Sequence, residues 1–312
     1  MKLYSIDDMS VLPYTTAVTV GMFDGVHRGH GHVLRQLLAV AREEGVRPVV
    51  VTFDSHPRQV LHAEREEWLR LTTAEERLQR LEECGVEEVA MVHFTPQLAA
   101  LSACDFFERV LLGKLRCKAL VLGYDNAFGN RALGDFDRLP ALAARRGVRV
   151  CVDTPLTVGG VEVSSTKVRQ ALWAGDVDRA ATLLGYRYRL WGTVVKGRQV
   201  GRTLGFPTAN VCLDDSTKVV PAAGVYAVRV LGVEKWGMAN FGGQPTFGLV
   251  QTVFEVNIVD YDGDLYGKVL TVEFVDRIRD VRRFEGVEQL VRQLEEDRRT
   301  ARERLGRIEN CD

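Results

Sequence analysis

The chain has 312 residues, of which 46% are hydrophobic and 27% charged, so its composition is typical of globular proteins and its length allows two domains. Its formal net charge of -1 argues against the strongly basic surface of a nucleic-acid binder. The six cysteines form no Cys-x-x-Cys pair, and the chain has neither an apolar leader nor a run of about 18 apolar residues, so we predict a cytoplasmic protein with reduced thiols.

Short apolar runs alternate with amphipathic segments through the first half of the chain. Strands are predicted at residues 17–21, 48–53, 88–92, 119–123 and 148–152, and helices from about residue 29 and near residues 73–84, 104–115 and 139–146. Alternation of this kind indicates βαβ units, and therefore an α/β fold with a parallel sheet. Open sheets of this type bind ligands at the carboxyl ends of their strands.

Two histidines, His27 and His30, lie where the first predicted strand gives way to the first predicted helix. A helix N-terminus presents unpaired backbone N–H groups, and Gly25 and Gly29 allow the backbone to approach an anion closely. The imidazoles add hydrogen-bond donors at the same place. This pattern indicates a nucleotide polyphosphate ligand and transfer at phosphorus, with a pair of capping or surface histidines as the alternative interpretation.

A second candidate anion site lies at Ser164, Ser165 and Thr166, just before Arg169. Hydroxyl side chains favour helix N-caps, and an arginine one turn later adds a forked donor for phosphate. A plain helix cap with a solvated arginine is the alternative. Combined with the two histidines, the segment suggests two phosphate clamps that close on one nucleotide.

After residue 185 the pattern changes to short alternating strands separated by glycines. These strands are predicted at residues 188–195, 207–213, 224–231, 236–241, 252–259 and 269–274, and a charged helix is predicted from about residue 287 to 305. The pattern predicts a small antiparallel barrel or sandwich. We therefore expect two domains, residues 1–185 and residues 186–312.

The run of residues 192–210 is the most specific motif in the chain. Its glycines include Gly197, Gly201 and Gly205. Glycines at this spacing suit a loop whose backbone approaches phosphates. Thr208 and Asn210 alternate with Ala209, so both side-chain oxygens project from one face and suit a Mg²⁺ ion that carries ATP phosphates. The alternative is a glycine-rich hairpin without a ligand.

An acidic residue lies within the predicted strand of residues 252–259. Three apolar side chains occupy one face of this strand and leave Glu255 and Asn257 on the other. A carboxylate held there can accept a proton from a substrate hydroxyl. An ordinary amphipathic strand is the alternative interpretation.

The motifs of the first half resemble the FMN adenylyltransferase half of bacterial bifunctional riboflavin kinase/FAD synthetases, which belong to the nucleotidyltransferases with a His-x-Gly-His signature. The similar segments are residues 21–30, 51–58, 123–125, 128–129 and 164–169. The resemblance implies a Rossmann-like domain in which the FMN phosphate attacks the α-phosphorus of ATP, with Mg²⁺, and releases pyrophosphate. It also implies that His27 and His30 stabilise the transferring phosphate, with Arg169 and the hydroxyls of residues 164–166 assisting.

By the same resemblance, several further residues of this half contact ATP or FMN. They are Gly21, Phe23, Asp24, Gly29, Phe53, His56, Pro57, Asp125, Ser164, Ser165 and Thr166. One departure is visible, because the family usually has a basic side chain in the loop after Asp125, whereas this chain has Asn126 and Ala127. The catalytic residues are intact, but the flavin affinity of this site is put in question.

The second half resembles the riboflavin kinase module nearly residue for residue. The similar segments are residues 192–210, 224–226, 239–242, 245–247, 253–258, 265–267 and 278–280, with Phe284. The resemblance implies a six-stranded barrel with a terminal helix, in which Thr208 and Asn210 bind Mg-ATP and Glu255 acts as the base on the riboflavin 5′-hydroxyl. The other implied ligand-binding residues are Gly197, Gly201, Arg202, Gly205, Pro207, Asn240, Arg279 and Phe284.

The resemblance spans about residues 16 to 305 and implies a bifunctional enzyme that uses ATP to convert riboflavin to FMN and FMN to FAD. Two alternatives remain, a kinase whose first site is impaired at residues 126–127 and a flavin- or nucleotide-binding regulator without turnover. We expect small-molecule substrates, no nucleic-acid or membrane partner, and a monomer or weak homo-oligomer.

Overall fold

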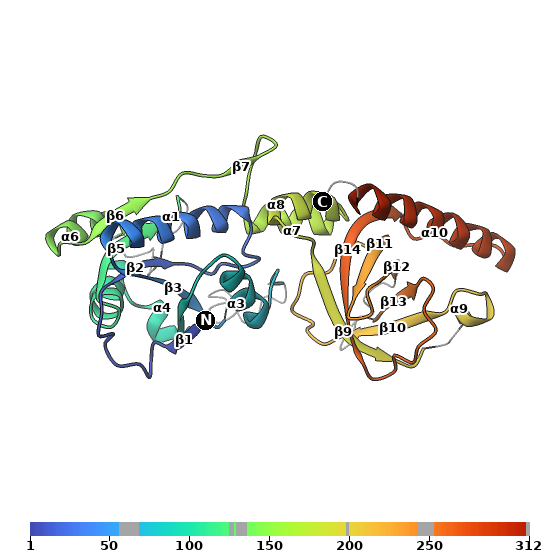
Figure 1. Ribbon diagram of the computed structural model, residues 1–312, viewed down its shortest axis with the longest axis horizontal. Coiled ribbons are helices and arrows are strands. Elements are labelled where there is room, and N and C mark those ends of the chain that lie inside the picture. The colour runs from blue at the N-terminus through green and yellow to red at the C-terminus, as the bar shows by residue number, and fades with distance from the viewer. Residues whose placement is uncertain (56–68, 125–127, 129–135, 198–199, 243–252, 310–312) are drawn as a thin grey trace. The chain divides into compact units, whose positions relative to one another are not determined.

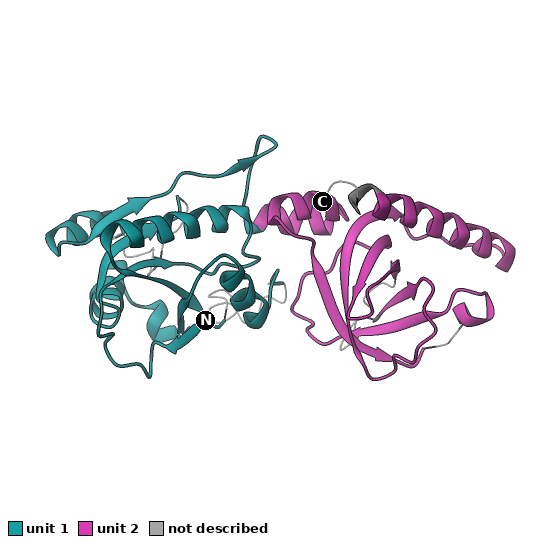
Figure 2. Ribbon diagram, in the orientation of Figure 1, with its two compact units in different colours: residues 1–165 teal, residues 166–312 magenta. Residues whose placement is uncertain are grey.

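The computed structural model describes residues 1–55, 69–124, 128, 136–197, 200–242 and 253–309 (Figure 1). The chain divides into two units, Met1–Ser165 and Thr166–Asp312 (Figure 2). The domain boundary expected between residues 185 and 186 stays a prediction.

The first unit contains a six-stranded parallel sheet with the strand order β1-β4-β3-β2-β5-β6. The strands are β1 (Lys2–Ser5), β2 (Thr16–Val20), β3 (Arg47–Phe53), β4 (Glu88–Val92), β5 (Cys117–Leu122) and β6 (Arg149–Val152). The parallel sheet and its five predicted strands are confirmed. Strand β1 was not predicted, because it has four mostly exposed residues and no apolar run.

Helices cover both faces of this sheet. They are α1 (Arg28–Glu44), α3 (Ala74–Glu83), α4 (Pro96–Ala99), α5 (Ala103–Phe106), the π-helix η1 (Phe107–Leu112), the 3-10 helix η3 (Phe136–Arg138) and α6 (Leu139–Arg145). Alternate residues of β3 enter different apolar clusters, since Val50 packs with Leu34 and Leu37 of α1, whereas Val49 and Val51 pack on the opposite face. A small hairpin, β7 (Thr157–Val158) and β8 (Val161–Glu162), completes the unit.

The second unit contains a closed antiparallel barrel with the strand order β10-β13-β12-β11-β14-β9. The strands are β9 (Arg189–Val195), β10 (Thr208–Leu213), β11 (Gly224–Leu231), β12 (Lys235–Phe241), β13 (Val253–Ile258) and β14 (Val269–Arg279), and the helices are α7 (Ser165–Trp173), α8 (Val177–Leu184), α9 (Val200–Thr203) and α10 (Val287–Glu309). All six predicted strands are confirmed, and closure decides for the barrel over the sandwich. Strand β14 continues beyond the predicted end at residue 274.

The terminal helix α10 packs against the outer wall of the barrel, along β11, β12 and β14 (Figure 1). Ala301 and Leu305 of the helix join an apolar cluster with Ala227, Met238 and Val275 of the strands. Opposite residues of antiparallel strands share a face, so Asn257, which pairs with Met238, lies on this same outer wall. The helix and the wall together frame the candidate site of the second unit.

Candidate active sites

The predicted His27 and His30 lie together at the carboxyl end of β2. His27 is the N-cap of α1, and its Nδ1 accepts the His30 backbone N–H at 3.2 Å. An Nδ1 that accepts a hydrogen bond carries no proton, so neutral His27 holds its proton on Nε2. The two imidazole rings stack with centroids 3.6 Å apart. The pair therefore provides an imidazole donor at a helix N-terminus.

The environment of His30 favours a neutral imidazole. Burial, the neighbouring His27 and the charge of Arg77 together hold the pKa of His30 well below its usual range. Its Nδ1 is buried and has no hydrogen-bond partner within the described part of the chain. A buried polar atom without a partner is costly, so a ligand donor or a water is the natural partner for this nitrogen.

The loop before the histidines has an unusual backbone that is fixed by buried hydrogen bonds. Phe23 and Val26 both have positive φ, 50° and 34°, which is rare for residues other than glycine. The buried Asp24 carboxylate accepts the backbone N–H groups of Leu71 and Thr72 at 3.0 to 3.1 Å. Asp24, expected to contact a ligand, thus directs its carboxylate into the protein and holds the loop in place.

The segment around the predicted Ser164–Thr166 site contributes to the same loop. Ser165 Oγ donates to the Asp24 carbonyl at 2.9 Å, and a Cβ added at Gly29 would lie 3.1 Å from the His27 ring and 3.3 Å from the Val163 carbonyl. A side chain at Gly29 would therefore require the histidine ring to shift by a few tenths of an ångström. Within α7, Arg169 is only 6% exposed, so it is not the solvated arginine of the alternative interpretation.

The remaining predicted residues of the first unit are placed in part. Gly21 follows β2, and the Phe23 ring packs against His30 with centroids 5.1 Å apart. Phe53 ends β3, and its ring meets Phe94 edge to face. His56, Pro57 and Asp125, together with the departures at Asn126 and Ala127, lie outside the described residues.

In the second unit, three neighbouring strands bring the predicted residues together. Asn210 of β10 and Asn240 of β12 each lie directly opposite Glu255 of β13, and Thr208 lies opposite Asn257. These five side chains therefore share the outer wall of the barrel. Asn257 Nδ2 donates to the Pro207 carbonyl at 2.8 Å, which anchors the start of β10.

A cavity of about 160 Å³ lies over this group of side chains. Its polar lining is Thr208, Asn240, Glu255, Asn257, Arg279, Arg282 and Asp297, and its apolar lining includes Phe284, Leu290 and Leu294. Segments that are distant in sequence, namely β10, β12, β13, the end of β14 and α10, meet here. The sequence-based grouping of Thr208, Glu255, Arg279 and Phe284 agrees with one shared cavity.

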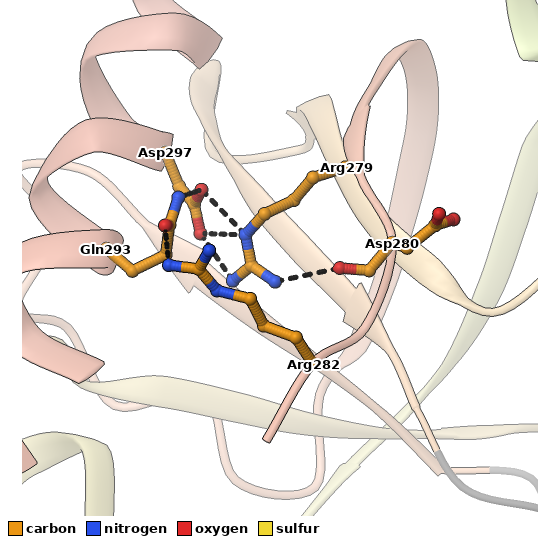
Figure 3. Close-up of polar contacts among 5 residues, drawn as sticks. All are labelled: Arg279, Asp280, Arg282, Gln293 and Asp297. Carbon is orange, nitrogen blue, oxygen red and sulfur yellow. Dashed lines mark hydrogen bonds and ion pairs between the residues drawn. The ribbon is translucent and has the colours of Figure 1, made fainter. Parts of the chain in front are cut away.

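Arg279 is held by α10 through a bidentate ion pair (Figure 3). Its Nε and Nη2 donate to the fully buried Asp297 carboxylate at 2.7 to 3.0 Å, and Gln293 Nε2 donates to the same carboxylate at 2.7 Å. Arg282 donates to Gln293 Oε1 and lies over the Phe284 ring. The guanidinium of Arg279 therefore supports the cavity wall more than it offers free donors to a ligand.

A larger cavity of about 510 Å³ lies on the other side of β10. Its lining includes Arg202 and Pro207, the segment Tyr261–Tyr266, and Thr208. Thr208 therefore borders both cavities, the larger one and the one beside Glu255. No role was predicted for residues 261–264, whose only signal in the sequence was the polar run after a strand.

The glycine-rich run has an ordered part that explains one of its glycines. Gly201 and Arg202 lie in the helical turn α9, and Gly205 follows it. A Cβ added at Gly197 would lie 2.1 Å from Asn210 Nδ2, so a side chain at this position would displace the Asn210 amide. The predicted Mg²⁺ ligand Asn210 is thus packed against the backbone of the run.

Two buried charged residues were missed from sequence. Arg77 on α3 is 4% exposed and Asp297 on α10 is 0% exposed. Each lies four residues before a fully buried apolar residue of the same helix, Leu81 or Ala301. A charge on the apolar stripe of an amphipathic helix was the signal that would have identified them.

The chain is similar in sequence to two known protein families, one for each unit. Residues 11–167 match the FAD synthetase family and residues 184–305 match the riboflavin kinase family. The bifunctional riboflavin kinase/FMN adenylyltransferase of Escherichia coli K12 is 39% identical over 311 residues, covering 98% of each chain. The chain belongs to this bifunctional family. The family member from Bacillus subtilis is 36% identical, covering 92% of this chain and 91% of its own.

A solved structure from Streptococcus pneumoniae, described as a macrolide-efflux protein, is also similar to the chain described here. It has a TM-score of 0.85 and 35% sequence identity, and the match covers 96% of this chain and 97% of the other. Among the helices that the structure describes here, none is both long and apolar enough to cross a membrane.

Proposed function

We propose that the barrel unit phosphorylates riboflavin to FMN beside Glu255, and that the histidine loop of the first unit transfers the adenylyl group of ATP to FMN, which gives FAD and pyrophosphate. The observation that carries the kinase assignment is that Thr208 borders two cavities, one large enough for a nucleotide and one with a carboxylate in its wall. A phosphate chain lying across Thr208 would join the two substrates.

In the kinase step, Glu255 is the base. Its carboxylate takes the proton of the riboflavin 5′-hydroxyl, the hydroxyl oxygen attacks the γ-phosphorus of ATP, and the bond to the bridging oxygen of ADP breaks. On this proposal, Phe284 and Arg279, which is held by Asp297, border the isoalloxazine ring of riboflavin. Arg202, Gly201 and Pro207 lie on the nucleotide side.

Thr208 and Asn210 are the proposed ligands for Mg²⁺. Their hydroxyl and amide oxygens are hard donors that alternate along β10 and lie on the same wall as Glu255, so they suit this ion. The described residues hold no group of three His, Cys, Asp or Glu side chains that could form an all-protein metal site, which favours an ion shared with phosphates. When bound, Mg²⁺ supplies neutralisation of charge on the phosphates.

In the adenylyl transfer step, His27 and His30 stabilise the transferring phosphate. An FMN phosphate oxygen attacks the α-phosphorus of ATP, and the bond to the leaving pyrophosphate breaks. The Nε2–H of His27 and the exposed N–H groups at the start of α1 are donors for the charge that develops. We assign supporting roles to Arg169, Thr166 and Ser164, and we propose that Phe53, together with His56 and Asp125 outside the described residues, serves flavin binding.

We assign the two activities to the parts of the chain that match the two families. They leave residues 168–183, most of α7 and α8, between them, and we place the boundary between the activities at residues 185/186.

Five cysteines in the described part are free thiols, which suits the cytoplasmic location that we propose. We also propose that the enzyme acts on small molecules as a monomer or weak homo-oligomer, without a nucleic-acid partner.

The test is to incubate the protein with riboflavin, ATP and Mg²⁺ and to separate the flavins by chromatography. FMN followed by FAD supports both steps, FMN alone supports the kinase-only alternative, and unchanged riboflavin supports the regulator. The His27→Ala/His30→Ala double variant is expected to stop FAD formation from FMN and to leave riboflavin phosphorylation intact. Loss of both activities in a folded double variant contradicts the two-site assignment.

A further inference from the structure

Arg77 is a buried cation directly beneath the histidine loop. It lies on α3, is 4% exposed, and donates from Nη1 to the Met22 carbonyl at 3.2 Å and from Nη2 to the Phe53 carbonyl. Met22 lies in the loop between β2 and His27, and Phe53 is the last residue of β3. One guanidinium thus ties together the carboxyl ends of two adjacent strands.

The burial of this charge demands an explanation. A charged group taken out of water is strongly unfavourable unless its surroundings compensate it. Within the described residues, Arg77 forms no ion pair, and its hydrogen-bond acceptors are two backbone carbonyls, although Asp24 and Asp54 are near enough to stabilise its charge. Neighbouring Arg70 acts in the opposite direction. The arginine is therefore held at a place where a neutral apolar residue would pack at lower cost.

The location of Arg77 relates it to the histidines in two ways. Its hydrogen bond to the Met22 carbonyl, which also accepts Thr52 Oγ1 at 3.3 Å, fixes the backbone that leads into the strained loop. Its positive charge lies near enough to His30 to help lower the pKa of that imidazole, together with burial and His27. Both effects act on the groups that we propose to face the phosphates of the nucleotide.

We propose that Arg77 is a positioning residue for adenylyl transfer, which clamps the ends of β2 and β3 so that His27 and His30 meet the triphosphate in one geometry and under a positive potential. The inference rests on the proposed function of the two histidines and deepens it. A group that holds transition-state donors in place affects kcat more than KM, because misplacement of about 1 Å costs on the order of 10²-fold in rate.

The test compares Arg77→Gln, which removes the charge, with Arg77→Lys, which keeps it. Arg80→Gln is the matched control, since Arg80 lies on the same helix and pairs with Glu83 at the surface. For Arg77→Gln we expect kcat for FAD formation from FMN to fall about 100-fold, with the KM for ATP changed less than about 3-fold. Arg77→Lys should recover most of this loss, Arg80→Gln should match the wild type, and riboflavin phosphorylation should be unchanged in all three.

The outcomes separate this inference from the function on which it rests. A folded Arg77→Gln variant with wild-type kcat overturns the role of Arg77, and so does a folded Arg77→Lys variant as impaired as Arg77→Gln. The His27→Ala/His30→Ala variant is assayed beside them. If that double variant still makes FAD, the proposed function fails, whereas its inactivity beside an active Arg77→Gln variant refutes only the positioning role.

A second measurement keeps the inference testable if Arg77→Gln does not fold. The six histidines of the wild type can be titrated by NMR, with His30 assigned through His30→Ala. We expect a His30 pKa below 6.5 in the wild type and in Arg77→Lys, because burial, His27 and the cation at position 77 all lower it. A His30 pKa at or above 6.5 in either protein would contradict the buried, positively charged environment assigned to this imidazole, and would overturn the inference.

Discussion

Glu255 lies directly opposite Asn210 in the register of β13 and β10. Opposite residues of antiparallel strands have their Cβ atoms about 5 Å apart and on the same face. The proposed base and a proposed Mg²⁺ ligand are therefore held side by side by main-chain hydrogen bonds of a closed barrel. Neither side chain depends on a loop for its position.

Glu255→Gln is expected to lower FMN formation from riboflavin by about 10² to 10⁴-fold, because an amide cannot accept the hydroxyl proton. Adenylylation of supplied FMN should be unchanged, since the histidine loop is in the other unit. Chromatographic separation of flavins measures both activities in one variant. Glu234→Gln, in the exposed turn between β11 and β12, is the control, and normal kinase turnover in Glu255→Gln would remove Glu255 from the role of base.

Asp297→Asn should destabilise the barrel unit and loosen the riboflavin site. Loss of one partner from a buried ion pair costs about 3–5 kcal/mol, and Asp297 is buried while Arg279 is 18% exposed. We expect a lower free energy of unfolding for this unit and a raised KM for riboflavin. Asp276→Asn, which breaks the more exposed pair with Arg304, should cost about 1 kcal/mol or less. Equal losses of stability in the two variants would refute the structural weight given to Asp297.

Substitution by alanine should lower kcat at one glycine of α1, Gly29, and leave it unchanged at another, Gly31. A Cβ at Gly29 meets the His27 ring at 3.1 Å, whereas a Cβ at Gly31 has only the end of Arg35, at 3.7 Å, near it. Gly29→Ala should reduce kcat for FAD formation about 3- to 10-fold because the ring must shift by a few tenths of an ångström. Gly31→Ala should leave kcat unchanged and stabilise the helix by about 1 kcal/mol. Thermal unfolding and single-substrate kinetics measure the two effects, and equal kcat values would contradict the packing argument.

The contact between His93 and Asp54 predicts a pH-dependent contribution to stability. The hydrogen bond and charge of Asp54 raise the pKa of His93 above 6.5, so stability from this group is present below that pH and is lost as the pH rises through its folded pKa. Burial acts to raise the pKa of Asp54, but hydrogen bonds from His93, Phe94 and Ser55 outweigh it and hold the pKa below 3.8, so its contribution is present above 3.8 and is lost as the pH falls through the folded pKa.

His93→Gln should therefore lower the unfolding temperature of the first unit most between about pH 4 and pH 6.5, within the window set by these two groups. The difference from the wild type should shrink at more acidic and at more alkaline pH. Melting curves from pH 3 to pH 9 give the profile. A difference that does not vary with pH would show that the pair contributes through packing instead of charge.

Much of the fold was predictable because most of its strands have a recognisable local sequence pattern. The strands of both units are apolar runs or alternations bounded by glycines, and those patterns predicted every strand except β1 and the small hairpin β7–β8. Strand β1 escapes because an edge strand with exposed side chains has no periodicity to detect. The choice between barrel and sandwich depends on closure between β9 and its two neighbours, which no local pattern encodes.

The candidate sites were predictable where one motif carries the chemistry and less so where partners are distant. His27, Thr208 and Glu255 stand in recognisable local contexts, and the structure places them at a helix start and on one barrel wall. The inward direction of Asp24 was not predictable, because its partners at residues 71 and 72 lie beyond both α1 and β3 in the sequence. A residue type indicates that a carboxylate is present, and only the fold decides what it faces.

The barrel and the six-stranded parallel sheet differ in how they expose backbone groups to other chains. A closed barrel has no free edge, whereas the parallel sheet ends at β1 and β6. Each of these edge strands has only four residues and begins with a cation, Lys2 or Arg149, features that discourage pairing with a second molecule. Removal of β1 would turn the buried, apolar β4 into an edge, so trimming the first residues would convert a guarded sheet into a template for aggregation.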